Sequence, residues 1–67
     1  MVQLATFNKE FFATYSEFGV VSVHSTAAGK ELGRLYLKDV AHMEADQGTC
    51  SLAIVTSDEL LVFKVDI

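Results

Sequence analysis

The chain has 67 residues, of which 51% are hydrophobic and 21% charged; this composition excludes a disordered tail and leaves room for one domain, expected over residues 1–67. Proline is absent and there are only 4 glycines, so collagen-like and low-complexity classes are excluded as well. The net charge is −4, and because the few basic residues are scattered, direct binding to nucleic acid is not expected.

The first predicted element is a helix over about residues 8–18. Its aromatic residues recur at spacings of four, four and three, the period of a helical stripe: Phe7, Phe11, Tyr15 and Phe18. Asn8 is a favourable N-cap, and Gly19 can adopt the left-handed conformation that commonly follows a helix. Residues 2–7 alternate too briefly to distinguish a strand from a lead-in.

After Gly19 the hydrophobic period becomes two, which predicts β-strands. We expect four strands, over about residues 20–25, 34–44, 50–56 and 59–66, joined by turns. The predicted fold class is therefore α+β, with the N-terminal helix (about 8–18) packed on a four-stranded antiparallel sheet. A small closed β-barrel with one helix is the alternative.

Several predicted strands are apolar on both faces, although one short helix can cover only one face of a sheet. A domain of this size is marginally stable alone, and the single Cys50 can form no internal disulfide. We therefore expect a homo-oligomer, most simply a two-fold dimer. Its predicted interface contains Leu60, Val62, Val20 and Tyr36. A closed monomeric barrel would use both faces internally.

Acidic residues concentrate in the second part of the chain. Residues 1–38 contain four basic and three acidic residues, whereas residues 39–67 contain one basic and six acidic residues. Carboxylates on a rigid sheet edge can steer association with a protein that has a basic surface. The predicted partner-binding residues are Asp39, Glu44, Asp46, Asp58 and Glu59.

The sequence offers little support for metal binding or catalysis. His42, Glu44 and Asp46 alternate and would share a strand face, as metal ligands could. Any solvated strand face has the same pattern, so no metal site and no cofactor is predicted. Cys50 begins an apolar strand and is expected to be a small buried hydrophobe rather than a nucleophile. No catalytic constellation accompanies these residues, and an enzyme is not expected.

The apolar spacing of residues 37–65 resembles that of the later strands of pleckstrin-homology-like and GRAM-like sheets. In those sheets, too, a short Asp-Val turn, here Asp39-Val40, precedes a strand pair. The resemblance covers less than half of the chain and assigns no family and no lipid-binding residue.

The favoured function is that of a small acidic, non-enzymatic protein-binding module, such as an inhibitor, a counter-defence factor of a phage or mobile element, or an antitoxin-like protein. One alternative is a small-molecule or nucleotide sensor with a ligand site made of Phe12, Tyr15, Tyr36, Lys30 and Arg34. Another is a structural subunit of a larger assembly. Lys9 and Glu10 interrupt the N-terminal apolar residues, so no secretory leader or membrane association is expected, and the expected location is cytoplasmic.

Overall fold

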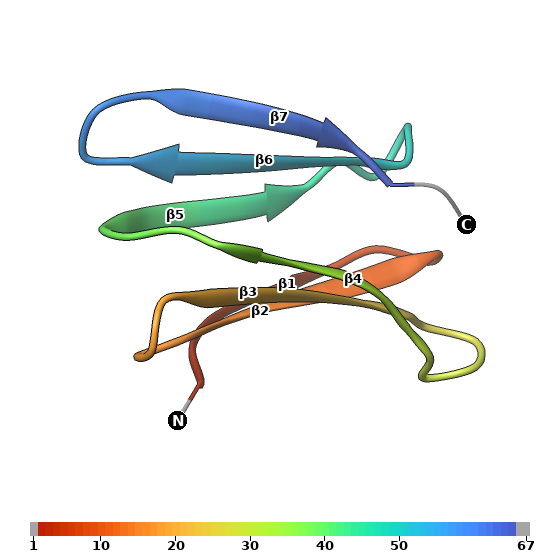
Figure 1. Ribbon diagram of the computed structural model, residues 1–67. Helices are drawn as coiled ribbons and strands as arrows, with labels where there is room; N and C mark the ends of the chain where they lie inside the picture. The colour runs from red at the N-terminus through yellow and green to blue at the C-terminus, as the bar shows by residue number, and fades with distance from the viewer. Residues whose placement is uncertain (1, 66–67) are drawn as a thin grey trace.

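The computed structural model describes residues 2–65 and shows an all-β protein (Figure 1). Its strands, in chain order, are β1 (Val2–Phe7), β2 (Phe11–Ser16), β3 (Val20–Ser25), β4 (Glu31–Tyr36), β5 (Val40–Ala45), β6 (Ser51–Thr56) and β7 (Leu60–Lys64). No helix forms within residues 2–65, and this part of the chain therefore contains no helix that could cross a membrane.

The strands form two antiparallel sheets that lie face to face (Figure 1). The first sheet has the order β1-β2-β3-β4 and the second the order β5-β6-β7. Each strand pairs with the next one along the chain, so both sheets are meanders. The chain passes from the first sheet to the second through the turn between β4 and β5, where Asp39 has a positive φ of 58°.

The predicted N-terminal helix is wrong, and with it both the α+β fold class and the barrel with one helix. Residues 11–16 form β2, and Phe11, Ala13 and Tyr15 are buried while the alternate residues lie on the outer face. A spacing of four fits a helical stripe, but it is also a multiple of the strand period of two. The spacing of Phe11 and Tyr15 is therefore compatible with both structures, whereas Phe7 and Phe18 lie outside β2 and are exposed.

Asn8 supports a turn with the hydrogen bonds expected of a helix cap. Its side-chain Oδ1 accepts hydrogen bonds from the backbone N–H groups of Glu10 and Phe11, both at 2.8 Å. The same bonds from the second and third residues after an Asn characterise a helix N-terminus. Gly19, with a φ of 80°, lies in the hairpin turn between β2 and β3. Asn8 and Gly19, which were expected to begin and end a helix, instead lie in the turns before and after β2.

The strands predicted after Gly19 are present with one difference. The strands over 20–25, 50–56 and 59–66 correspond to β3, β6 and β7, although residue 66 lies outside the described residues. The strand predicted over 34–44 is two strands, β4 and β5, which belong to different sheets. The reversal at Asp39 separates them.

The hydrophobic core lies between the inner faces of the two sheets. β2 and β3 supply one side of the core, and β5 and β6 supply the other. The buried apolar residues are Phe11, Ala13, Tyr15, Val21, Val23, Met43, Ala45, Leu52 and Ile54. Burial of these side chains provides the main favourable free energy for packing the sheets together.

The two sheets are joined along the side where β1 lies next to β5. The Ala45 N–H donates to Thr6 Oγ1 at 3.0 Å, and Asn8 Nδ2 donates to the Asp46 carbonyl at 2.9 Å. Gln47 Nε2 adds a third, exposed bond to the Phe7 carbonyl at 2.9 Å. These bonds satisfy backbone groups of two strand edges that would otherwise be open.

Replacement of Asn8 tests the importance of this junction. Asn8 is only 6% exposed, and Asn8→Ala removes three side-chain hydrogen bonds. Because buried donors and acceptors lose their partners, we expect the free energy of unfolding to fall by about 2–4 kcal/mol in urea titrations. Gln47→Ala, which removes an exposed bond across the same junction, should cost less than about 1 kcal/mol. Equal losses for the two variants would contradict this account.

Candidate functional site

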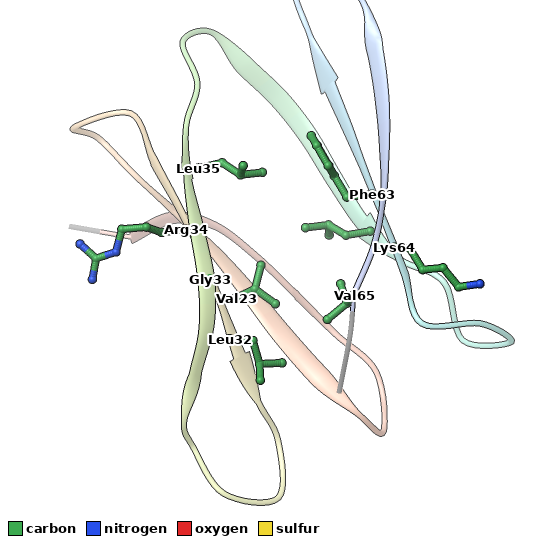
Figure 2. Close-up of a pocket in the computed structure, with 9 residues that line it drawn as sticks. Val23, Leu32, Gly33, Arg34, Leu35, Phe63, Lys64 and Val65 are labelled. Carbon is green, nitrogen blue, oxygen red and sulfur yellow. The ribbon is translucent and has the colours of Figure 1, made fainter.

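One candidate site is an apolar groove between β4 and β7 (Figure 2). It has a volume of roughly 290 Å³ and lies on the side where the two sheets do not meet, since β4 and β7 make no close backbone approach. Its apolar lining residues come from the inner faces of both sheets: Val23, Leu32, Leu35, Leu52, Phe63 and Val65. The groove is therefore the part of the hydrophobic core that is open to solvent.

Figure 2 shows how the side chains around this groove are directed. Leu32 and Leu35 on one side and Phe63 and Val65 on the other point into the space between the strands. The side chains of Arg34 and Lys64 point away from it, one on each side. The groove therefore offers apolar contact inside, and its two basic groups lie outside.

Arg34 is engaged on the outer face of the first sheet. Its guanidinium donates to both carboxylate oxygens of Glu31, with Nε–Oε1 and Nη2–Oε2 distances of 2.9 and 3.2 Å. Interaction with the Tyr36 side chain contributes most to raising the Arg34 pKa above its usual value, and Glu31 adds to the shift. The ion pair is exposed, so it adds little stability. The guanidinium of Arg34 is nevertheless already bonded to the Glu31 carboxylate.

The outer edge of β7 carries unpaired backbone groups. The Thr56 N–H donates to the Glu59 carbonyl, and the Val65 N–H donates to the Cys50 carbonyl. Since hydrogen-bonded pairs alternate along an antiparallel ladder, the odd-numbered residues of this segment bond to β6. The N–H and C=O groups of Leu60, Val62 and Lys64 therefore point toward the open edge, where no strand within residues 2–65 pairs with them.

The predicted partner-binding acidic residues do not form one edge. Asp39, Asp58 and Glu59 lie at one end of the molecule, where the Ser57 N–H donates to the Asp39 carbonyl at 3.1 Å. Asp46 lies in the loop after β5, at the opposite end of the second sheet. Glu44 lies between these ends, on the exposed face of β5.

The predicted oligomer-interface residues lie on two different faces. Leu60 and Val62 are on the outer face of the second sheet, where they are 64% and 65% exposed beside Val55. Val20 and Tyr36 are paired in register on the outer face of the first sheet. No single flat interface can contain all four of the predicted residues.

The alternative ligand-site residues are also divided. Phe12, Arg34 and Tyr36 share the outer face of the first sheet, whereas Tyr15 is buried in the core. Lys30 lies in the hairpin between β3 and β4. None of the three hollows described in this section is lined by more than one of these residues. Phe12 stacks on His24, its partner on β3, with a distance of 5.1 Å between ring centroids.

The residues considered for metal binding do not gather into a site. His42 and Glu44 are neighbours on the exposed face of β5, with a nitrogen–oxygen distance of 3.8 Å. Asp46 has its Oδ1 bonded to the Gly48 N–H. No group of three potential ligands that could hold a metal occurs within residues 2–65. Cys50 is a free, half-buried thiol.

Two further hollows border the loop that follows β5. One, of roughly 180 Å³, lies between residues 8–10 and 47–50. The other, of roughly 380 Å³, is lined by residues 44–47 and Ala53. Neither borders the open edge of β7, so the groove between β4 and β7 remains the candidate site.

Sequence reasoning did not identify this groove. The predicted strands over 20–25 and 34–44 leave Leu32 and Gly33 in the connection between them, yet both residues belong to β4. The alternation of Leu35 with Arg34 and of Phe63 with Lys64 indicated inward-facing side chains. The missing information was that these inner faces separate at β4 and β7, which depends on how the sheets pack.

No protein-family model matches the chain, and no curated protein and no solved structure matches it either. The resemblance of residues 37–65 to pleckstrin-homology-like sheets therefore gains no support from a match. The structure by itself defines an antiparallel sandwich that is joined along one side and open along the other.

Gly33 provides a way to fill the groove. It pairs with Val23, so an added side chain would point inward, and a Cβ there would meet no atom within 4 Å. We expect Gly33→Val to raise the unfolding free energy by about 0.5–1 kcal/mol, because glycine is entropically unfavourable in a strand. The variant should also reduce the fluorescence of anilinonaphthalene sulfonate bound to the folded protein.

Ser22→Val is the matched control for this variant. It adds the same side chain to the outer face of β3, away from the groove. Dye binding should remain at the wild-type level in this control. Equal dye binding by Gly33→Val and wild type would mean that the groove is not the main exposed apolar site.

Proposed function

We propose that the chain is a non-enzymatic protein-binding module that accepts an extended segment of another polypeptide along β7. The observation that carries this proposal is the coincidence of an apolar groove with a free strand edge. Either feature alone would be ambiguous, but together they match the requirements of an added β-strand. Its backbone would bond to the edge, and its alternate side chains would cover the groove.

The backbone of β7 supports this mode of binding. Leu60, Val62 and Lys64 present outward N–H and C=O groups in a regular strand, inferred from the bonding alternation described above. An extended peptide satisfies these groups in pairs and places successive side chains on opposite faces. A helix, which uses its own backbone groups internally, would leave them unsatisfied.

The side chains support an apolar occupant with charged ends. β7 begins after Asp58 and Glu59 and ends at Lys64, with apolar residues between them. An antiparallel segment with acidic residues near its N-terminal end and basic residues near its C-terminal end would complement this arrangement. The acidic end formed by Asp39, Asp58 and Glu59 is consistent with the expected preference for a basic surface on a partner.

An inhibitor, counter-defence or antitoxin-like role remains a prediction that rests on the size and charge of the chain. The sensor and the structural subunit remain alternatives to be tested. The residues expected for a sensor are spread over a sheet face, the core and a hairpin. Strand addition has the better support because its donors, acceptors and apolar contacts occur at one place.

A proline substitution tests strand addition at β7. Val62→Pro removes one outward N–H without removing a bond to β6, and proline is tolerated at such edge positions. The probe is a fluorescein-labelled peptide of alternating valine and threonine with an N-terminal aspartate and a C-terminal lysine. We expect Val62→Pro to weaken binding in fluorescence anisotropy by roughly tenfold or more.

Val62→Thr is the matched control, because it keeps the N–H and the strand preference of the residue. It should bind the probe within about threefold of the wild type. A probe with N-methylated amides on the side that faces β7 should not bind. Equal binding by the proline and threonine variants, both folded by circular dichroism, would exclude β7 as the binding edge.

A further inference from the structure

The charge pattern along β7 is complementary to itself. Leu60, Val62 and Lys64 alternate along the exposed face of the strand, and Asp58, two residues before Leu60, lies in the hairpin turn that precedes it. The order is acid, apolar, apolar, base. When such a segment is reversed, as in an antiparallel pair of identical strands, each acid lies opposite a base and each apolar residue lies opposite an apolar residue.

One register brings these residues together. If two copies of β7 pair around a two-fold axis at Leu61, then Leu60 lies opposite Val62 of the second copy. The same register brings Asp58, in the turn just before β7, close to Lys64 of the second copy, and symmetry provides both contacts twice. An axis at Val62 would place Lys64 opposite Leu60, and an axis at Phe63 would place it opposite Val62. Only the register around Leu61 matches both the charges and the apolar residues.

The backbone is compatible with this register. Residues 60, 62 and 64 have outward-facing N–H and C=O groups, as derived from the bonds of Glu59 and Val65 to β6. The pair of Leu60 with Val62 of the second copy would therefore be hydrogen-bonded. The Leu61 residues on the two-fold axis would form a non-hydrogen-bonded pair, which is the required alternation of an antiparallel ladder.

The charged groups are available for such a contact. Within the described residues, neither the Asp58 carboxylate nor the Lys64 ammonium takes part in an ion pair, and both residues are exposed. A lysine on an edge strand commonly opposes further strand addition. Here an acid lies at the position that would meet the lysine, so the same residue would select one register instead.

Pairing would also extend the apolar surfaces. The second sheets of the two copies would form one six-stranded sheet, because each has three strands. The exposed apolar residues Val55, Leu60 and Val62 would then become part of a continuous strip across the joined sheet. The inward-facing Leu61 and Phe63 of the second copy would lie beside the groove and lengthen its apolar lining.

We propose that the strand accepted by β7 is β7 of a second copy of the chain, paired antiparallel around Leu61 with Asp58 close to Lys64. This inference rests on the proposed function, because it names the occupant of the same edge.

Charge reversal tests the register. Sedimentation equilibrium should show a dimer for the wild type and a dimerisation constant weakened by roughly tenfold or more for Asp58→Lys and for Lys64→Asp. The double variant Asp58→Lys with Lys64→Asp should recover to within about threefold of the wild type. Glu59→Lys is the control. In this register Glu59 would lie opposite Phe63 of the second copy and not opposite a charged residue, so this substitution should change dimerisation less. A double variant as weak as the single variants would overturn the proposal.

Disulfide trapping provides a second, independent measurement. In a Cys50→Ala background, Leu61→Cys should form a disulfide-linked dimer under mild oxidation, because paired Cα atoms on this axis would be about 4.5 Å apart, within the range of a disulfide. Val62→Cys, which would be trapped by the register centred on Val62, should be linked much more slowly. Faster linkage of Val62→Cys would overturn the proposed register.

The result also separates this inference from the proposed function. A wild-type chain that is monomeric at high micromolar concentration but binds the valine–threonine probe would disprove self-pairing and leave strand acceptance intact. A dimer that survives Val62→Pro would show that copies associate through another surface, which overturns self-pairing at β7. Failure of the probe to bind at concentrations where the chain is monomeric would count against the proposed function itself.

Discussion

The central constraint in this molecule is that two sheets of unequal width share one core and meet along only one side. Where β1 approaches β5, side chains of Thr6 and Asn8 satisfy backbone groups of the opposite sheet. Where β4 and β7 separate, apolar side chains reach the surface, and no strand of residues 2–65 pairs with the outer edge of β7. Unpaired edges and exposed apolar surface both favour association with another chain. The proposed strand acceptance and the proposed self-pairing are two consequences of the same incomplete closure.

The accuracy of the sequence analysis followed the clarity of the alternation. β3, β6 and β7 combine β-branched residues with a period of two, and their positions were predicted. β2 was mistaken for a helix because its aromatic residues recur at intervals that satisfy both periods, and because Asn8 makes the same local bonds in either structure. The split between β4 and β5 depends on a left-handed residue at Asp39, which the amino-acid type only weakly indicates.

The candidate site was harder to predict than the strands for a physical reason. The excess of apolar surface could be read from Leu60, Val62 and their neighbours, since both faces of the last strand are apolar. The groove, in contrast, requires knowing that Leu35 and Phe63 face one another across a gap between sheets. Sequence periodicity specifies the face of a residue within its own strand. It contains no information about which strand edges a second sheet will cover.

The Asn8 amide has a consequence for the order in which the fold forms. Its bond to Asp46 connects residues 38 positions apart, whereas its bonds to Glu10 and Phe11 span only two or three positions. The short-range bonds can form as soon as the first hairpin nucleates, but the long-range bond must await loop closure between the two meanders. One side chain thus links an early folding event to a late one. The junction between the two sheets would open before either meander unfolds. The native ensemble would then include a state in which both sheets are formed but the junction is open.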